Sequence, residues 1–199
     1  MSKIISSSIL LILLILFLGC GGSKTESESK TADSALKASE TGAGGILDSL
    51  NKENIDEYYD QLVLGQAPDF ILFNLDGTRY TLEDFKDYVI ILHFWSMESA
   101  LSKRLFPLLS EVNNMFRDSN FVILGVCMDT REIKSIREYA DYNKISFPIV
   151  YPQSQTIYRS YGVAEAGVSY LIDRKGNVVG QFFGDPGREK LIRIISLFL

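Results

Sequence analysis

The stretch VIILHFWSMESALSKRLFPLLSEV, from Val89 to Val112, carries the signal that decides the fold class. Apart from one histidine, its first seven residues are apolar, which is typical of a strand buried on both faces of its sheet. From Ser99 onward the apolar residues recur at helical spacing, so we predict a helix over 99–117. A buried strand that leads directly into a helix indicates an α/β domain.

Elements of the same two kinds are predicted on both sides of this stretch. Strands alternate with helices toward the C-terminus, and the order ends in an antiparallel strand pair and a closing helix. Such an order implies an α/β fold with a central mixed β-sheet and helices on both faces. The predicted elements are a hairpin of 70–74 and 79–81 across Asp76-Gly77, strands over 121–128 and 148–151, helices over 131–143 and 155–161, the strand pair 168–172 and 177–183, and a last helix capped by Asp185 with Pro186 at its first position.

The N-terminus resembles a bacterial lipoprotein signal. Lys3 provides a short positive region, Ile9 to Leu18 is an unbroken apolar stretch, and Gly19 then precedes Cys20. On this resemblance residues 1–19 are a signal peptide, and Cys20 becomes the lipid-bearing first residue of the mature chain. The protein is then exported and anchored in a membrane, facing the periplasm or the cell exterior. The alternatives are a plain signal peptide and an uncleaved anchor, although the apolar stretch is shorter than the ~20 residues of a membrane span.

Two segments separate the signal from the globular domain. Residues 20–45 are mostly small and polar, so we predict a disordered tether after the lipidated cysteine. Residues 46–61 are predicted to form a short docking helix, because Asn54 followed by Glu57 is typical of a capping box. The globular domain is expected over 62–199.

Composition narrows the classes of partner. The chain has 20 Lys and Arg against 25 Asp and Glu, a formal net charge of −5, and no basic block. This argues against binding to nucleic acid and leaves proteins, peptides or small molecules as partners, with the membrane reached through the lipid on Cys20. A single histidine, His93, and two distant cysteines, Cys20 and Cys127, do not make a zinc ligand set. We expect no metal and no cofactor.

Short landmarks along residues 62–199 carry a resemblance to a known family. They are Ala67-Pro68-Asp69-Phe70, Thr81-Leu82-Glu83-Asp84-Phe85, Ile91-Leu92-His93-Phe94-Trp95 with Pro107, Phe147-Pro148, Tyr161-Gly162-Val163 and Leu171-Ile172-Asp173. In this order they resemble the redoxin group of thioredoxin-like proteins, above all the membrane-anchored thiol-disulfide oxidoreductases of TlpA/ResA type. The resemblance implies a thioredoxin-like fold for the whole domain.

The resemblance also implies where an active site would lie. Members of the family carry Trp-Cys-x-x-Cys at the start of the helix after the central strand, and a cis-proline loop packs against the cysteine pair. On this chain the first motif falls on Glu98-Ser99-Ala100-Leu101-Ser102, and the proline falls on Gly167. Both cysteines are therefore serines. Ser99, Ser102 and Gly167 are degenerate positions, and no catalytic residue is assigned.

The serines lack the chemistry that the family's reaction needs. A hydroxyl is far less acidic than a thiol, whose pKa of ~8.5 falls further at a helix start, and it forms no disulfide. Glu98 adds a negative charge where a thiolate would develop, which disfavours ionisation. We expect Ser99 to cap the helix and Ser102 to be exposed in its first turn. His93, within an apolar strand, is expected to be a hydrogen-bonded core residue.

Cys127 is the remaining candidate for thiol chemistry. It lies in the apolar run from Phe121 to Met128, where a free cysteine normally packs as a small hydrophobic side chain. We therefore expect it to be buried. The alternatives are a redox-sensitive free thiol, and an enzyme of the oxidoreductase or antioxidant class that uses Cys127 or an unrecognised mechanism.

The favoured hypothesis is a redox-inactive, membrane-anchored thioredoxin-like lipoprotein that binds a protein or peptide in the cell envelope. Its contact surface is predicted at the former active site. This surface comprises Glu98, Ser99, Ala100, Leu101, Ser102, Ala166, Gly167 and Val168. Several departures from the family pattern gather there while the framework landmarks persist, which indicates that the fold was kept and the redox reaction lost.

Overall fold

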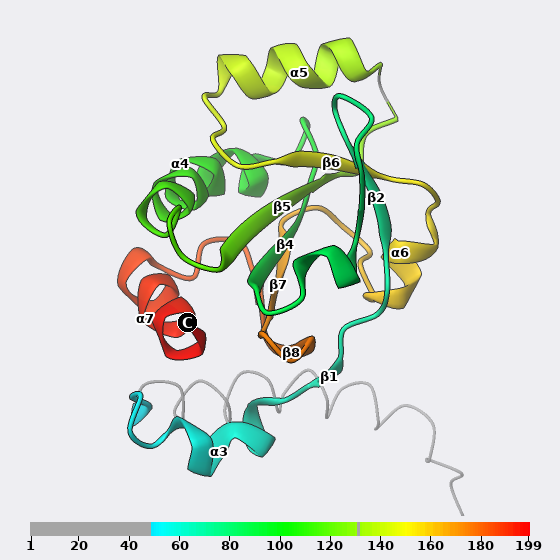
Figure 1. Cartoon of the computed structure of the whole chain (residues 1–199). Helices are drawn as coiled ribbons and strands as arrows, with labels where there is room; N and C mark the ends of the chain where they lie inside the picture. The colour runs from blue at the N-terminus through cyan, green and yellow to red at the C-terminus, as the bar shows by residue number, and fades with distance from the viewer. Residues whose placement is uncertain (1–48, 131) are drawn as a thin grey trace, which may run out of the picture. The chain divides into compact units, whose positions relative to one another are not determined.

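The computed structural model describes residues 49–130 and 132–199 (Figure 1). The predicted signal peptide, the lipidated Cys20 and the tether lie outside the described residues. Within the described ranges, no helix combines the length and the apolar character that a membrane crossing requires. The elements are α3 (Ile55–Leu62), β1 (Gly65–Gln66), β2 (Ile71–Asn74), β3 (Arg79–Thr81), the 3-10 helix η1 (Leu82–Phe85), β4 (Val89–Trp95), α4 (Ala100–Met115), β5 (Phe121–Cys127), α5 (Ile133–Tyr142), β6 (Ile149–Pro152), α6 (Thr156–Ser160), β7 (Val168–Ile172), β8 (Asn177–Phe183) and α7 (Arg188–Phe198).

An eight-stranded sheet organises the domain. The strand order is β1-β8-β7-β4-β5-β6-β2-β3. The pairs β4–β5 and β5–β6 are parallel, and the other pairs are antiparallel. The central strand β4 is buried at every residue, as its apolar run predicted. The prediction of a central mixed sheet is confirmed.

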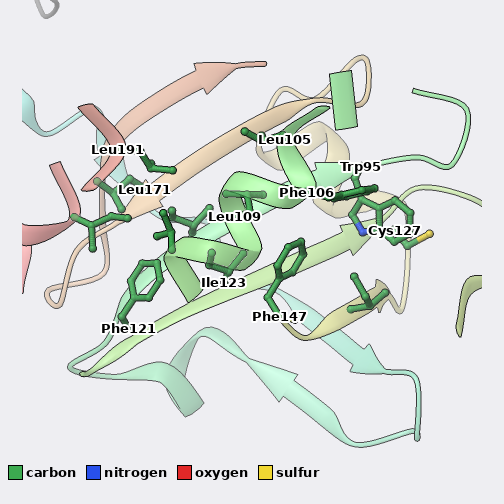
Figure 2. Packing of buried hydrophobic residues seen from close by; sticks show 14 of the residues in the cluster. Trp95, Leu105, Phe106, Leu109, Phe121, Ile123, Cys127, Phe147, Leu171 and Leu191 are labelled. Carbon is green, nitrogen blue, oxygen red and sulfur yellow. The ribbon is translucent and has the colours of Figure 1, made fainter. Parts of the chain in front are cut away.

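Helices cover both faces of this sheet. Successive side chains of β4 point to opposite faces and pack against different helices. Trp95 packs on one face with residues of α4 and α7, whereas Phe94 packs on the other face with Ile157 of α6. Figure 2 shows part of the first cluster, which includes Leu105, Phe106, Leu109, Phe121, Ile123, Leu171 and Leu191. The predicted α/β fold with helices on both faces is therefore confirmed.

The first described helix is shorter than predicted. α3 spans Ile55–Leu62 instead of 46–61, of which 46–48 lie outside the described part. The predicted capping box at Asn54 and Glu57 is wrong, because no side-chain hydrogen bond caps this helix. The Asn54 carboxamide oxygen instead accepts a hydrogen bond from the backbone N–H of Asn51 at 2.7 Å. The Asn54 side chain, which was expected to cap the helix, therefore stabilises the preceding turn instead.

The last helix begins later than predicted. α7 starts at Arg188, and Gly187 occupies the N-cap position. Gly187 has a φ of +86°, a left-handed conformation that does not continue a helix back to Pro186. The prediction that Asp185 caps this helix is therefore wrong. Its Oδ1 accepts a hydrogen bond from the Gly187 N–H at 2.8 Å, within the turn before the helix.

Gly125 of β5 provides a test of the core packing. A Cβ atom on Gly125 would lie 2.7 Å from Phe147 Cε2 and 3.2 Å from Trp95 Nε1, both in the buried core. Gly125→Ala is therefore expected to lower the free energy of unfolding by ~1–3 kcal/mol, as measured by urea denaturation.

Gly180 of β8 supplies the matched control. A Cβ atom there would lie 3.4 Å from Leu171 Cβ, an ordinary contact, so Gly180→Ala is expected to change the stability far less. Equal unfolding midpoints for the two variants would contradict the close packing at Gly125.

Candidate functional site

The degenerate motif lies at the junction of β4 and α4. Ser99 is the N-cap of α4, with an extended backbone at φ −76° and ψ 117°. Its hydroxyl oxygen accepts a hydrogen bond from the backbone N–H of Ser102 at 3.2 Å. This satisfies one of the N–H groups that a first helical turn leaves unpaired. The predicted capping role of Ser99 is confirmed.

Ser102 is buried, so the prediction that it is exposed is wrong. Its exposed fraction is 0 %, and its hydroxyl oxygen accepts a long hydrogen bond from the Ser96 N–H at 3.5 Å. The cause is the phase of the helix: Ser102 lies three and four residues before Leu105 and Phe106, on the buried face of α4. Ser102 therefore offers no surface to a partner.

The two segments that were predicted to form the site do meet, at Leu101 and Gly167. A Cβ atom on Gly167 would lie 3.1 Å from Leu101 Cβ, so the leucine side chain lies against the glycine. Gly167 has a φ of +107°, which favours glycine, and no described peptide bond is cis. The start of α4 and the loop before β7 are therefore adjacent, as the family resemblance implied.

The backbone N–H and carbonyl groups of Gly167 both form hydrogen bonds within the domain. Its N–H donates to the Phe94 carbonyl at 2.7 Å, and its carbonyl accepts from the Gly184 N–H at 2.9 Å. The strand that follows, β7, is paired on both edges, with β4 and with β8. A partner chain cannot add as a further strand at this point, and contact must go through side chains.

The eight residues of the predicted contact surface differ in exposure. Glu98 and Ala100 are exposed, and three more are half-buried, namely Ser99, Leu101 and Ala166. The prediction is wrong for the remaining three, Ser102, Gly167 and Val168, because they are buried. Val168 begins an interior strand, and its side chain packs into the core cluster that contains Phe94.

Phe183 belongs to the site and was not predicted. It ends β8, its side chain is 52 % exposed, and its Cε2 lies 3.6 Å from the Cβ position of Gly167. Strand register places it opposite Val168, so the predicted pairing of 168–172 with 177–183 contained the signal. We name the accessible residues of this region, Glu98, Ala100, Leu101, Ala166 and Phe183, the site face.

Asp129 fixes the loop that carries Glu98. Its Oδ2 accepts a hydrogen bond from the Met97 N–H at 2.8 Å, and its Oδ1 accepts one from Ser96 Oγ at 3.4 Å. Charge-assisted hydrogen bonds of this kind are stronger than neutral ones. Asp129, which follows the end of β5, therefore holds the loop before α4 in place. This role was not predicted, because 32 residues separate Met97 from Asp129.

Cys127 is buried, as predicted. It ends β5 opposite Trp95 and is 1 % exposed (Figure 2). Burial raises the pKa of its thiol to about 12, and the charge of Asp129 also acts in this direction. The thiol donates a hydrogen bond to Asp129 Oδ2 at 3.6 Å. At neutral pH the thiol is therefore almost entirely protonated.

His93 is a hydrogen-bonded core residue, as predicted. It is fully buried on β4, and its Nδ1 lies 2.8 Å from Ser169 Oγ on the neighbouring strand. Burial lowers the pKa of the imidazole to about 4, so the ring is neutral at physiological pH. Its Nε2 has no hydrogen-bond partner within the described part of the chain.

Two open hollows in the described part are lined by residues outside the site face. One of about 380 Å³ is lined by residues that include Leu64 and Tyr170, and one of about 310 Å³ is lined by residues that include Phe70 and Ile157. Across residues 49–130 and 132–199, no group of three or more His, Cys, Asp or Glu side chains is placed to hold a metal ion.

Comparison with known proteins agrees with this geometry. The profile of the AhpC/TSA family matches residues 63–181. The thiol-disulfide oxidoreductase ResA of Bacillus thuringiensis is 27 % identical over 126 residues, which cover 63 % of this chain and 72 % of ResA.

Solved structures show the same fold. The thioredoxin domain of a thiol-disulfide oxidoreductase from Bacteroides vulgatus has a TM-score of 0.61 at 24 % identity, and the match covers 68 % of this chain and 96 % of that one. The exposed lipoprotein thioredoxin of Streptococcus pneumoniae has a TM-score of 0.57 at 21 % identity, with coverage of 65 % and 98 %. Because the family profile spans most of the globular domain, the chain belongs to the AhpC/TSA family and is a thioredoxin-like protein of the ResA/TlpA type.

Proposed function

We propose that this protein is a redox-inactive thioredoxin-like module that binds a protein or peptide in the cell envelope through its site face. The observation that carries the proposal is the presence of Ser99 and Ser102 where the family's reaction needs two cysteines. The relative from Bacillus thuringiensis is named for thiol-disulfide chemistry, and this chain shares its framework without the two sulfur atoms.

The exchange reaction itself explains why the serines matter. A thiolate attacks a disulfide sulfur, and a second thiol then resolves the mixed disulfide. A serine hydroxyl can take neither part, because it is not ionised at neutral pH and forms no bond of this kind. Cys127 does not replace the pair, since its thiol is 1 % exposed and its pKa is raised to about 12.

The site face has the character of a protein contact. Phe183 and Leu101 lie together around Gly167 and give an apolar centre, and the exposed residue Glu98 lies three residues before Leu101, on the loop that leads into α4. Exposed aromatic side chains that are bordered by polar groups are typical of interface centres. Because the Gly167 backbone is already paired, recognition depends on these side chains and not on strand addition.

Export and membrane anchoring are part of the proposal. They rest on the N-terminal pattern of Lys3, the apolar stretch Ile9 to Leu18 and Cys20 as the lipidated residue. A protein of the same fold is named an exposed lipoprotein in Streptococcus pneumoniae, which is in keeping with this location.

Site-specific photo-crosslinking of the full chain in its native envelope tests the binding function. Benzoylphenylalanine in place of Ala100 or Phe183 is expected to give a discrete adduct of higher mass, because both positions lie on the site face. The same probe in place of Tyr142, which is 86 % exposed on α5, is the control and is expected to give no such adduct.

A second variant ties the adduct to the site face. Phe183→Ser is expected to reduce the yield from the probe at position 100 by at least about fivefold, because it removes the exposed aromatic of the contact. An adduct of equal yield at position 142, or an unchanged yield with Phe183→Ser, would contradict the proposed contact.

A further inference from the structure

The segment before the main sheet is attached to the β7–β8 turn through a tyrosine. Tyr59 of α3 donates its hydroxyl hydrogen to Asp173 Oδ2, and its oxygen accepts a hydrogen bond from Asn177 Nδ2 at 2.9 Å. Lys175 Nζ lies over the Tyr59 ring, 4.1 Å from its centroid. All three partners belong to the turn between β7 and β8 or to its edge.

Tyr59 completes the hydrogen bonding of a buried carboxylate. Asp173 is buried, and its Oδ1 already accepts the backbone N–H groups of Lys175 and Asn177, each at 2.9 Å. Its Oδ2 is the oxygen that Tyr59 reaches. Loss of the tyrosine hydroxyl would leave a buried charged oxygen without this partner, which is costly.

The rest of this segment packs mainly through a small cluster of its own. Tyr59 and Val63 are partly buried against the main core, whereas Leu50, Ile55 and Leu62 cluster with Leu197 and Phe198 at the end of α7. Strand β1 adds only two residues to the edge of β8, and the Leu64 N–H donates to the Val178 carbonyl at 2.8 Å. A segment with a separate small cluster and only two residues of strand pairing opens at a lower free energy than the core strands.

We propose that residues 50–66, which we name the strap, form a releasable unit that Tyr59 latches to the β7–β8 turn. The strap opens and closes while the sheet stays folded. Opening frees the edge of β8, which the strap otherwise covers, and removes the contact between α3 and α7.

The latch also determines where the tether leaves the domain. Tyr59 binds the turn end of the β7–β8 hairpin, whereas Gly167 and Phe183 of the site lie at the opposite end of the same two strands. This consequence rests on the proposed anchoring through Cys20: release of the strap lengthens the tether by up to ~55–60 Å of extended chain. The strap thus adjusts how far the site face reaches from the membrane.

Hydrogen exchange of the full-length protein tests the strap directly. In the wild type, the amides of α3 and of Leu64 are expected to exchange at least about 100-fold faster than those of β4 and β5. Tyr59→Phe is expected to accelerate exchange in the strap and in residues 174–177 by about tenfold, with less than a twofold change in β4 and β5.

Tyr58→Phe is the matched control. Tyr58 lies in the same helix but packs against the cluster of Leu50, Ile55 and Leu62, whereas the Tyr59 ring packs against the main core. The Tyr58 hydroxyl has no hydrogen-bond partner within 49–130 and 132–199. It is expected to leave strap exchange within twofold of the wild type. Strap amides as slow as those of β4, or equal effects of Tyr58→Phe and Tyr59→Phe, would overturn the latch. This test uses neither a partner nor a membrane, so its failure and a failure of the crosslinking test are separate results.

Discussion

Acidification from pH 7 to pH 4.5 is expected to lower the free energy of unfolding by about 2 kcal/mol through His93 alone. Burial on β4 lowers the pKa of His93 to about 4, whereas an unfolded histidine has a pKa of ~6.5. Between these values the unfolded chain binds a proton that the native state excludes. The stabilising contribution of neutral His93 is therefore complete above pH ~6.5 and is lost as the pH falls toward about 4.

The aspartates with shifted pKa values do not add to the loss of stability between pH 6.5 and pH 4.5. Hydrogen bonds from Thr78 and Thr81 hold the pKa values of Asp76 and Asp84 below their usual range. Carboxylates of this kind stabilise the fold above their unfolded pKa of ~3.9, and their contribution falls only below it. Loss of stability between pH 6.5 and pH 4.5 therefore reports chiefly on the histidine.

The variant His93→Asn separates this effect from the rest of the titration. Asparagine keeps a polar side chain opposite Ser169 but takes up no proton in this range. Urea denaturation at a series of pH values is expected to show a profile between pH 7 and pH 4.5 that is flatter by about 2 kcal/mol in the variant. Only the slopes are compared, so a lower overall stability of the variant does not matter. Parallel profiles would contradict a buried, neutral histidine.

The double variant Ser99→Cys/Ser102→Cys is expected to form an intramolecular disulfide under mild oxidation. Ser99 Oγ already reaches the backbone N–H of Ser102 at 3.2 Å, and residues three apart are neighbours at a helix start. Mass spectrometry without reductant should show the loss of two hydrogen atoms. The single variant Ser99→Cys is the control. Its new thiol should form no disulfide within the monomer, because Cys127 is buried.

Once its disulfide is reduced, the double variant is nevertheless expected to react slowly with disulfide-bonded protein substrates. A sulfur at position 102 would be buried, and the negative charge of Glu98 would raise the pKa of a thiol at position 99. Adding Glu98→Gln to the reduced double variant should therefore accelerate its attack on a disulfide-bonded model protein by about three- to tenfold. An unchanged rate would show that Glu98 does not affect this position.

The framework was predictable because its elements are long and periodic. The apolar run of β4, the helical spacing of α4 and the turn between β7 and β8 are local signals, and each appears in the structure within a few residues of its predicted bounds. The burial of Ser102 was missed although the helical phase indicates it. Leu105, Phe106 and Leu109 follow Ser102 at three, four and seven residues, but the serine itself adds no apolar residue to the pattern.

The features that were missed depend on contacts between distant parts of the chain. Asp129 reaches Met97 across 32 residues, and Tyr59 reaches Asp173 across 114. Phe183 becomes part of the site because strand register places it beside Gly167. Local sequence propensity does not indicate which distant residues contact each other. Once the pairing of the strands is known, it shows which of these residues lie side by side.

The central claim is that the fold has lost thiol–disulfide exchange, and catalytic turnover of a disulfide-bonded protein by the full-length wild-type chain tests it most directly. Cys127→Ala, which removes the sulfur of β5, is assayed beside it. We predict that neither protein accelerates reduction above the rate of the reductant alone, because Ser99 and Ser102 carry no sulfur and the Cys127 thiol is buried. Measurable turnover by the wild type that disappears in Cys127→Ala would contradict the account.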